Sequence, residues 1–166
     1  MTAVPGEIVG ILLAAGRGQR FGGDKLQHPL ADGTPLAVAA ANSLRPACDR
    51  LVAVLRPGAA RLAELLGAAG CETLVCDQAD GGMGHSLASA IRATPDAAGW
   101  VVALADMPYI ATASHRQVVA ALRCGASIGT TATAHSGHCA SIWRVASSLS
   151  CSPNRGADTS MPALVQ

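Results

Sequence analysis

Residues 12–26 of this chain read Leu12-Leu13-Ala14-Ala15-Gly16-Arg17-Gly18-Gln19-Arg20-Phe21-Gly22-Gly23-Asp24-Lys25-Leu26. They overlap the end of an apolar run, Ile8 to Ala14, that predicts a buried strand. The glycines allow backbone N–H groups to approach an anion closely, and Arg17, Arg20 and Lys25 can neutralise a polyphosphate. The stretch therefore predicts a phosphate-binding loop at the end of a strand, which we call the glycine loop (residues 14–25).

The spacing of the glycine loop excludes two common phosphate loops. A Walker A sequence ends in Gly-Lys-Ser/Thr, whereas Gly23 is followed here by an Asp-Lys-Leu run. A dinucleotide fingerprint needs a third glycine three residues after Gly18, but that position is Phe21. The alternative is a basic surface turn, although a motif with this many fixed positions seldom arises by accident behind a strand.

The glycine loop resembles the signature of the nucleotidyltransferases that attach a nucleotide to molybdopterin. Ala14-Ala15-Gly16, Arg20-Phe21-Gly22 and Lys25 fill that pattern in register. The resemblance implies a Rossmann-like α/β fold of three layers (αβα), of the nucleotide-diphospho-sugar transferase type. It also implies an enzyme that transfers CMP from CTP to the phosphate of molybdopterin, with Mg²⁺ as cofactor and pyrophosphate as the second product.

The resemblance also implies which residues of the loop act. The expected nucleotide-binding residues are Leu13, Ala14, Ala15, Gly16, Arg17 and Gly18. Arg20 and Lys25 are the expected catalytic cations on the phosphates, because positioning and charge neutralisation carry the rate of such transfers. Lys25 is expected to be the most rate-sensitive residue. Arg17 stands at a variable position of the family pattern, so a solvated surface arginine is the alternative there.

Asp106 is the expected metal ligand. It follows the apolar run Trp100 to Ala105, which predicts a buried strand, and an unpaired carboxylate at such a strand end is unfavourable. Mg²⁺ prefers one or two carboxylates together with phosphate oxygens. The matching Leu-Ala-Asp-Met-Pro stretch of the molybdopterin nucleotidyltransferases holds the metal. A helix N-cap or a structural ion pair is the alternative role.

Two further segments echo the family. Residues 81–87 resemble its Gly-Met-x-x-Ser-Leu turn, which opens a helix whose free N–H groups favour an anion or a polar base edge. Gly82 and Ser86 are therefore expected to bind nucleotide, the alternative being an ordinary helix start. Asp77 and Asp80 flank this turn, and each is a candidate contact to the ribose, the alternative being a solvated loop carboxylate. His138 follows a glycine as in a family motif that lines the pterin half of the site, so it is a candidate for substrate binding or a solvated loop histidine.

Alternating elements predict the fold class. The expected strands are Ile8–Ala14, Arg50–Leu55, Glu72–Cys76 and Trp100–Ala105. The expected helices are Pro35–Leu44 with Thr34 as its cap, Ala59–Ala69, Gly84–Ala93 and Ser114–Cys124. This alternation implies right-handed βαβ units and a mostly parallel sheet. Because ligands bind outside the carboxyl ends of such strands, the glycine loop, the turn at 81–86 and Asp106 are expected to gather at one edge.

The whole chain, residues 1–166, is expected to form a single nucleotidyltransferase domain, of which residues 7–124 match the family. Residues 125–166 are rich in Ser, Thr and Cys and show neither strand alternation nor a helical stripe. A shifted reading frame or a degenerate C-terminus would explain this atypical tail. Two strands would then be missing from the sheet, leaving an exposed edge.

Composition limits the partners. The formal net charge of +1 argues against a protein that binds nucleic acid or a membrane surface by bulk charge, and no apolar run reaches membrane-spanning length. Without a secretory pattern at the start, a cytoplasmic location is expected, and the six scattered cysteines are expected to be buried thiols. Small-molecule substrates are the expected partners, with a molybdoenzyme chaperone or apo-hydroxylase as the candidate protein partner.

The choice of nucleotide depends on two positions. Family members that use GTP tend to carry Gly-Gly where this chain has Ala14 and Ala15, and the added methyl groups narrow the space around the base. CTP is therefore expected over GTP. The alternatives are a sugar-phosphate nucleotidyltransferase, which the short chain disfavours, and a nucleotide-binding accessory domain without enzymatic activity.

Overall fold

The computed structural model describes residues 6–16, 24–125, 128–132 and 139–143. They form one mixed sheet of order β3-β2-β1-β4-β6-β5. Four parallel strands are its main part: β1 (Ile8–Leu13), β2 (Arg50–Leu55), β3 (Glu72–Val75) and β4 (Gly99–Leu104). The predicted mostly parallel sheet is confirmed.

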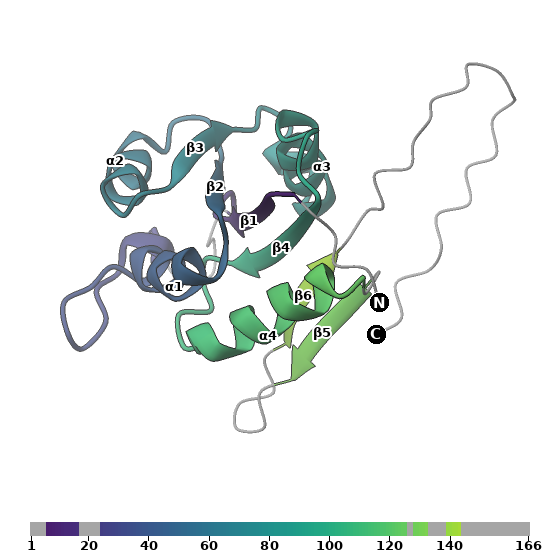
Figure 1. Ribbon diagram of the computed structural model, residues 1–166. Coiled ribbons are helices and arrows are strands. Elements are labelled where there is room, and N and C mark those ends of the chain that lie inside the picture. Colours follow the sequence, from purple (N-terminus) through teal and green to yellow (C-terminus); the bar gives the residue numbers. More distant parts are fainter. Residues whose placement is uncertain (1–5, 17–23, 126–127, 133–138, 144–166) are drawn as a thin grey trace, which may run out of the picture.

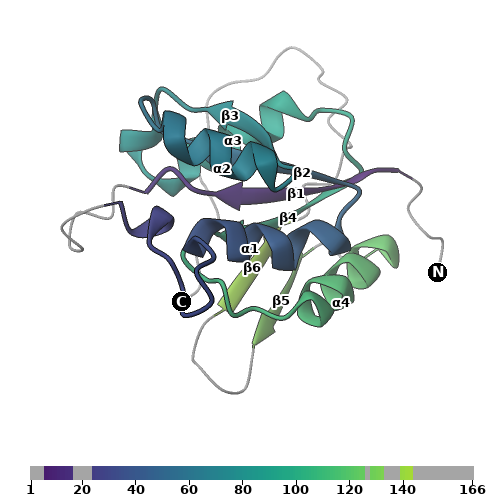
Figure 2. The same cartoon turned by 90° about the vertical axis from the view of Figure 1, so that its left-hand side faces the viewer.

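Helices cover both faces of the sheet, which confirms the three-layer αβα arrangement (Figure 1). One face carries α1 (Leu36–Leu44), α2 (Ala60–Ala68) and α4 (Thr112–Arg123), and Figure 2 looks onto this face. The other carries α3 (Met83–Ala93). Short 3-10 helices η2, η3 and η4 occupy Lys25–Gln27, Arg45–Ala47 and Ala79–Gly81.

The strand order explains why α3 lies apart. The chain steps outward from β1 to β2 to β3, and right-handed crossovers place both connecting helices on one face. It then returns past β2 and β1 to β4, so the same handedness places α3 on the opposite face. The direction reverses between β1 and β4. In open α/β sheets this switch point is where a ligand crevice forms, outside the carboxyl ends of the strands.

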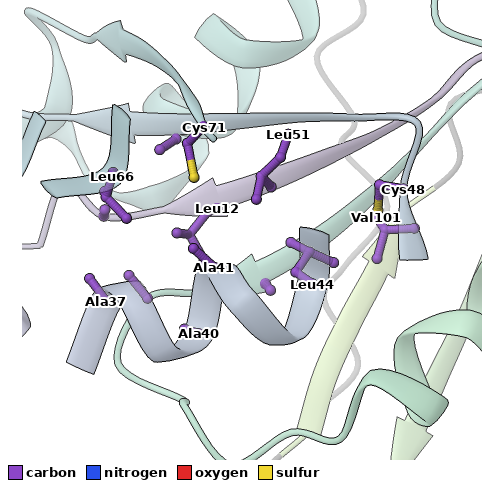
Figure 3. Close-up of a cluster of buried hydrophobic side chains, with 14 of the residues drawn as sticks. Leu12, Ala37, Ala40, Ala41, Leu44, Cys48, Leu51, Leu66, Cys71 and Val101 are labelled. Atoms are coloured by element: carbon purple, nitrogen blue, oxygen red, sulfur yellow. The ribbon is translucent and has the colours of Figure 1, made fainter. Parts of the chain in front are cut away.

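The core is aliphatic on both faces of β1. Small side chains of α1, Ala37, Ala40 and Ala41, share a buried cluster with Leu12, and Ala41 lies beside Leu12 (Figure 3), which lets the helix lie close to the sheet. Gly10 serves the same purpose, because a Cβ built there would lie 3.3 Å from Leu44 Cδ2 of α1. The opposite face buries a second cluster beneath α3. Burial on both faces explains why β1 is a continuous apolar run rather than an alternating one.

The predicted elements agree with the structure to within two residues at each end, but the predicted cap of α1 is wrong. The N-cap position is Pro35, and no side chain caps the helix. Thr34 instead closes a tight turn. Its N–H donates to Asp32 Oδ1 at 2.9 Å, and its carbonyl accepts from the Leu30 N–H at 2.8 Å.

The prediction that residues 125–166 lack strands is wrong for ten of these residues. They form β5 (Ile128–Ala132) and β6 (Cys139–Trp143), an antiparallel pair. β6 also pairs antiparallel with β4, Trp100 opposite Trp143, and so covers the edge that was expected to be open. Both strands are short and lack a period-two pattern, so pairing with an existing sheet edge specifies them more than local sequence does.

The cysteines follow the expected pattern only in part. Cys48, Cys71 and Cys76 are buried free thiols, whereas Cys124 is an exposed one. Burial raises the pKa of the Cys48 thiol to about 12 and that of the Cys71 thiol to about 11. Such thiols stay protonated at neutral pH and are poor nucleophiles. Within the described ranges, no helix is both long and apolar enough to cross a membrane.

Candidate active site

A cavity of about 330 Å³ opens where the switch point predicts a ligand crevice. Leu13 and Leu104 end β1 and β4, are register partners and line its floor. Four segments supply the walls: the start and end of the glycine loop, the η4–α3 turn and the residues after β4. The full lining is Leu13, Ala15, Gly16, Asp24, Lys25, Leu26, Ala79, Asp80, Gly82, Met83, Ser86, Leu104 and Asp106. The expected gathering of the three loops at one edge is therefore confirmed.

An ion pair joins two of these segments across 81 positions of sequence. Lys25 Nζ lies 3.3 Å from Asp106 Oδ2, and the two side chains are 37% and 45% exposed. A pair this exposed is screened by water and contributes little to stability. The lysine and the carboxylate can therefore separate when a ligand offers each of them another partner. In the described part of the chain, the cation beside Asp106 is Lys25.

Asp106 fits a divalent cation only if the ligand helps to hold it. Among the described residues, no group of three or more His, Cys, Asp or Glu side chains could hold a metal. Mg²⁺ does not need such a group, because it keeps several waters and commonly binds one or two carboxylates plus phosphate oxygens. A half-exposed Asp106 at the wall of a cavity suits such a shared ion.

The start of α3 presents polar groups to the same cavity. Gly82 has φ 106° and ψ 175°, in a region that favours glycine, and no side chain caps the helix that follows. Ser86, in the first turn, is 2% exposed and lines the cavity. Its hydroxyl makes no hydrogen bond to any group in the described part of the chain. A hydroxyl at the wall of a cavity is available to a ligand that enters it, and such a hydrogen bond contributes about 0.5–1.5 kcal/mol.

The predicted site residues divide into three groups. Seven line the cavity: Leu13, Ala15, Gly16, Lys25, Gly82, Ser86 and Asp106. Ala14 does not. Its side chain is buried in the core beneath α1, and its N–H donates to the Val54 carbonyl at 2.9 Å. Arg17, Gly18, Arg20 and His138 lie outside the described residues, so their roles stay predictions.

Sequence reasoning missed five lining residues, namely Asp24, Leu26, Ala79, Met83 and Leu104. Strand register would have identified Leu104, because it ends β4 opposite Leu13. Met83 is 64% exposed, and together with the leucines and Ala79 it gives the cavity an apolar side suited to a flat ring. Asp80, a candidate contact to the ribose, also lines the cavity.

Three comparisons identify relatives. A family model described as "MobA-like NTP transferase domain" matches residues 10–158. The purine catabolism protein PucB of Bacillus subtilis is 31% identical over 125 residues, covering 69% of this chain and 60% of PucB. The bifunctional protein GlmU of Leifsonia xyli subsp. xyli is 34% identical over 126 residues, covering 72% of this chain and 26% of GlmU.

Comparison with solved structures also identifies relatives. Rv0371c of Mycobacterium tuberculosis H37Rv superposes with a TM-score of 0.62 and 32% identity, covering 78% of this chain and 66% of that one. A second structure of Rv0371c, in complex with manganese, gives a TM-score of 0.61 and 25% identity, covering 75% of this chain and 63% of that one. The chain thus spans less than two thirds of these relatives. The family model, however, covers far more than half of its length, and the chain belongs to the family of MobA-like NTP transferase domains.

Proposed function

We propose that this chain is a nucleotidyltransferase that transfers CMP from CTP to the phosphate of molybdopterin and releases pyrophosphate. The observation that carries the proposal is the Lys25–Asp106 pair, which shares with the Ser86 hydroxyl a cavity at the switch point of the sheet. Family membership supports nucleotidyl transfer from a nucleoside triphosphate. The choice of molybdopterin as acceptor rests on the sequence resemblance of the glycine loop. The product would pass to a molybdoenzyme chaperone or apo-hydroxylase.

The described residues can perform this transfer without covalent chemistry of their own. Lys25 leaves Asp106 and neutralises the phosphates, while Ser86 and the first turn of α3 donate hydrogen bonds to the nucleotide. An acceptor phosphate oxygen attacks the α-phosphorus, and the bond from that phosphorus to the β-phosphate oxygen breaks. Mg²⁺, shared between Asp106 and the phosphates, would supply charge neutralisation when bound. Manganese in the complex of Rv0371c supports a role for a divalent cation.

The proposed preference for CTP over GTP depends on the methyl group of a single residue, Ala15. Only Ala15 lines the cavity, because Ala14 is buried in the core. The variant Ala15→Gly should therefore improve binding of GTP relative to CTP by about tenfold, the usual discrimination of a single methyl in a pocket. Ala14→Gly is the matched control. It should lower stability by about 1–2 kcal/mol and leave the ratio of the two affinities unchanged.

A thermal-shift panel tests the nucleotide half of the proposal. CTP, GTP, ATP and UTP are each added with Mg²⁺ and with a chelator. A ligand at a hundred times its dissociation constant adds about 2.7 kcal/mol, or about 5–10 °C in a chain of this size. We expect a CTP shift that requires Mg²⁺ and disappears in Asp106→Ala. A cooperative melt that no nucleotide shifts would refute the proposal.

The acceptor is tested separately. Turnover with molybdopterin is compared with turnover with a panel of sugar phosphates, each monitored by pyrophosphate release. Release only with molybdopterin supports the proposal. Release only with a sugar phosphate would make the chain a sugar-phosphate nucleotidyltransferase. Nucleotide binding without release for any acceptor would instead indicate an accessory nucleotide-binding domain.

A further inference from the structure

Arg56 connects the two described ends of the glycine loop. Its Nη1 donates to the carbonyl oxygen of Gly16 at 3.4 Å, and its Nη2 lies 3.7 Å from Asp24 Oδ2. Gly16 is the last described residue before positions 17–23, and Asp24 is the first after them. We propose that Arg56 is a positioning residue that ties both ends of the loop together and thereby sets the affinity for the nucleotide. This inference rests on the proposed function.

The fold brings Arg56 to this place through strand register. Parallel pairing of β1 with β2 sets Leu13 opposite Val54, so Arg56, two residues on, reaches the level of the first loop residues. Arg56 directly follows β2 and precedes Pro57, whose ring restricts the backbone conformation of the arginine. Arg56 is not among the residues that line the cavity. It therefore contacts the loop without itself lining the cavity.

An arginine suits this position better than a lysine. The guanidinium is planar and its N–H groups point in different directions. A single arginine side chain therefore reaches the Gly16 carbonyl before residues 17–23 and the Asp24 carboxylate after them. A lysine ammonium is a compact charge on a flexible stem. It can neutralise Asp24, but it does not hold two partners in a fixed relative geometry.

Asp24 shows why the tie bears on nucleotide affinity. Its side chain lines the cavity that we propose for a triphosphate, where an uncompensated carboxylate would repel the ligand. Arg56 provides the compensating charge, and Gln27 Nε2 donates to the same carboxylate oxygen at 2.8 Å. The next residue is Lys25, whose ammonium pairs with Asp106. Fixing Asp24 therefore also fixes the backbone from which Lys25 extends.

The test combines two measurements on the full chain. Amide hydrogen exchange without ligand reports on the tie at residues 15–16 and 24–27. The dissociation constant of CTP with Mg²⁺ reports on its consequence. The variants are Arg56→Ala, Arg56→Lys, Asp24→Asn and the double variant R56A/D24N. Arg61→Ala is the matched control, because Arg61 forms an ion pair with Glu64 on the surface of α2, away from the cavity.

We expect Arg56→Ala to speed exchange at both ends of the loop and to raise the dissociation constant about fivefold, as for loss of two half-exposed polar contacts. Arg56→Lys should restore part of the affinity, since it restores the charge, but it should not restore slow exchange at residues 15–16. In the Asp24→Asn background, loss of Arg56 should weaken binding less, because the charge that it neutralises has gone. Arg61→Ala should match the wild type in both measurements.

Three results would overturn the inference in distinguishable ways. If the wild-type protein binds no nucleoside triphosphate with Mg²⁺, the proposed function fails and the inference fails with it. If the wild type binds CTP but Arg56→Ala matches it in affinity, or in exchange at either end of the loop, only the role of Arg56 is wrong. Equal effects of Arg56→Ala with and without Asp24→Asn would also contradict the tie.

Discussion

Replacing Lys25 with alanine should separate catalysis from stability. The pair with Asp106 has a 3.3 Å separation and two side chains exposed by more than a third. In a water-like dielectric that distance corresponds to about 1.3 kcal/mol of attraction, which the entropy of holding two side chains reduces to about 1 kcal/mol or less. The melting temperature of the ligand-free protein should therefore fall by no more than about 4 °C.

The effect of Lys25→Ala on the reaction should be much larger. A cation or donor that faces the charge developing in the transition state typically supports the rate by a factor of about 10² to 10³. Single-turnover release of pyrophosphate, with molybdopterin as acceptor and with CTP and Mg²⁺ saturating, measures this step directly. The stability of the same sample, followed by thermal unfolding without ligand, provides the comparison.

The double variant K25A/D106A completes the experiment. If the two residues act together on the nucleotide, its rate should lie close to that of the worse single variant rather than at the product of the two losses. A fall in melting temperature of more than about 8 °C for Lys25→Ala would mean that the lysine is chiefly structural. A rate within twofold of the wild type would refute its catalytic role.

Three other residues give sharp predictions. Ser86→Ala removes a hydroxyl that makes no hydrogen bond within the described part of the chain, so the free energy of unfolding should not fall, while the dissociation constant of CTP rises about fivefold in a titration. Gly82→Ala forces alanine to φ 106°, and urea unfolding should show a loss of about 1–3 kcal/mol, whereas Gly84→Ala, which meets open space in α3, should be neutral or stabilising. Burial lowers the pKa of His115, whose Nε2 lies 3.3 Å from the Ser43 hydroxyl, so the unfolded chain binds a proton more readily. The free energy of unfolding should therefore decrease as pH falls below about 6.5, and His115→Gln should flatten that dependence between pH 5 and 8.

Local sequence predicts those parts of the fold that carry their own signal. The apolar run of β1 is specified by neighbours in the chain. So is the end of α2, which is followed by Gly70 with a φ of 82°. Strands β5 and β6 are not, because their pairing depends on the free edge of β4. A strand that is defined by its partner carries little pattern of its own.

The site shows the same division. Lys25, Ser86 and Asp106 belong to motifs in which each loop has its own signature, and the sheet brings these loops together. No sequence motif identifies Arg56. Its partners lie in the loop that follows β1, and the register of β1 and β2 brings them beside it. Ala14 shows that a residue of the motif need not line the site. It belongs to the motif, but continued pairing with Val54 turns its methyl group into the core.

The charges around the cavity also explain why nucleotide binding should depend on a metal ion. In the described part of the chain, Lys25 and Arg56 each face a carboxylate, Asp106 and Asp24 respectively. A free triphosphate that draws Lys25 away leaves Asp106 uncompensated beside the phosphates, and like charges at such distances repel. A triphosphate that carried Mg²⁺ would replace both partners at once, because the phosphates would pair with Lys25 and Asp106 would hold the metal. Lys25 and Asp106 would both keep an oppositely charged partner only if the metal is present. For this reason the increase in melting temperature produced by CTP should vanish with a chelator.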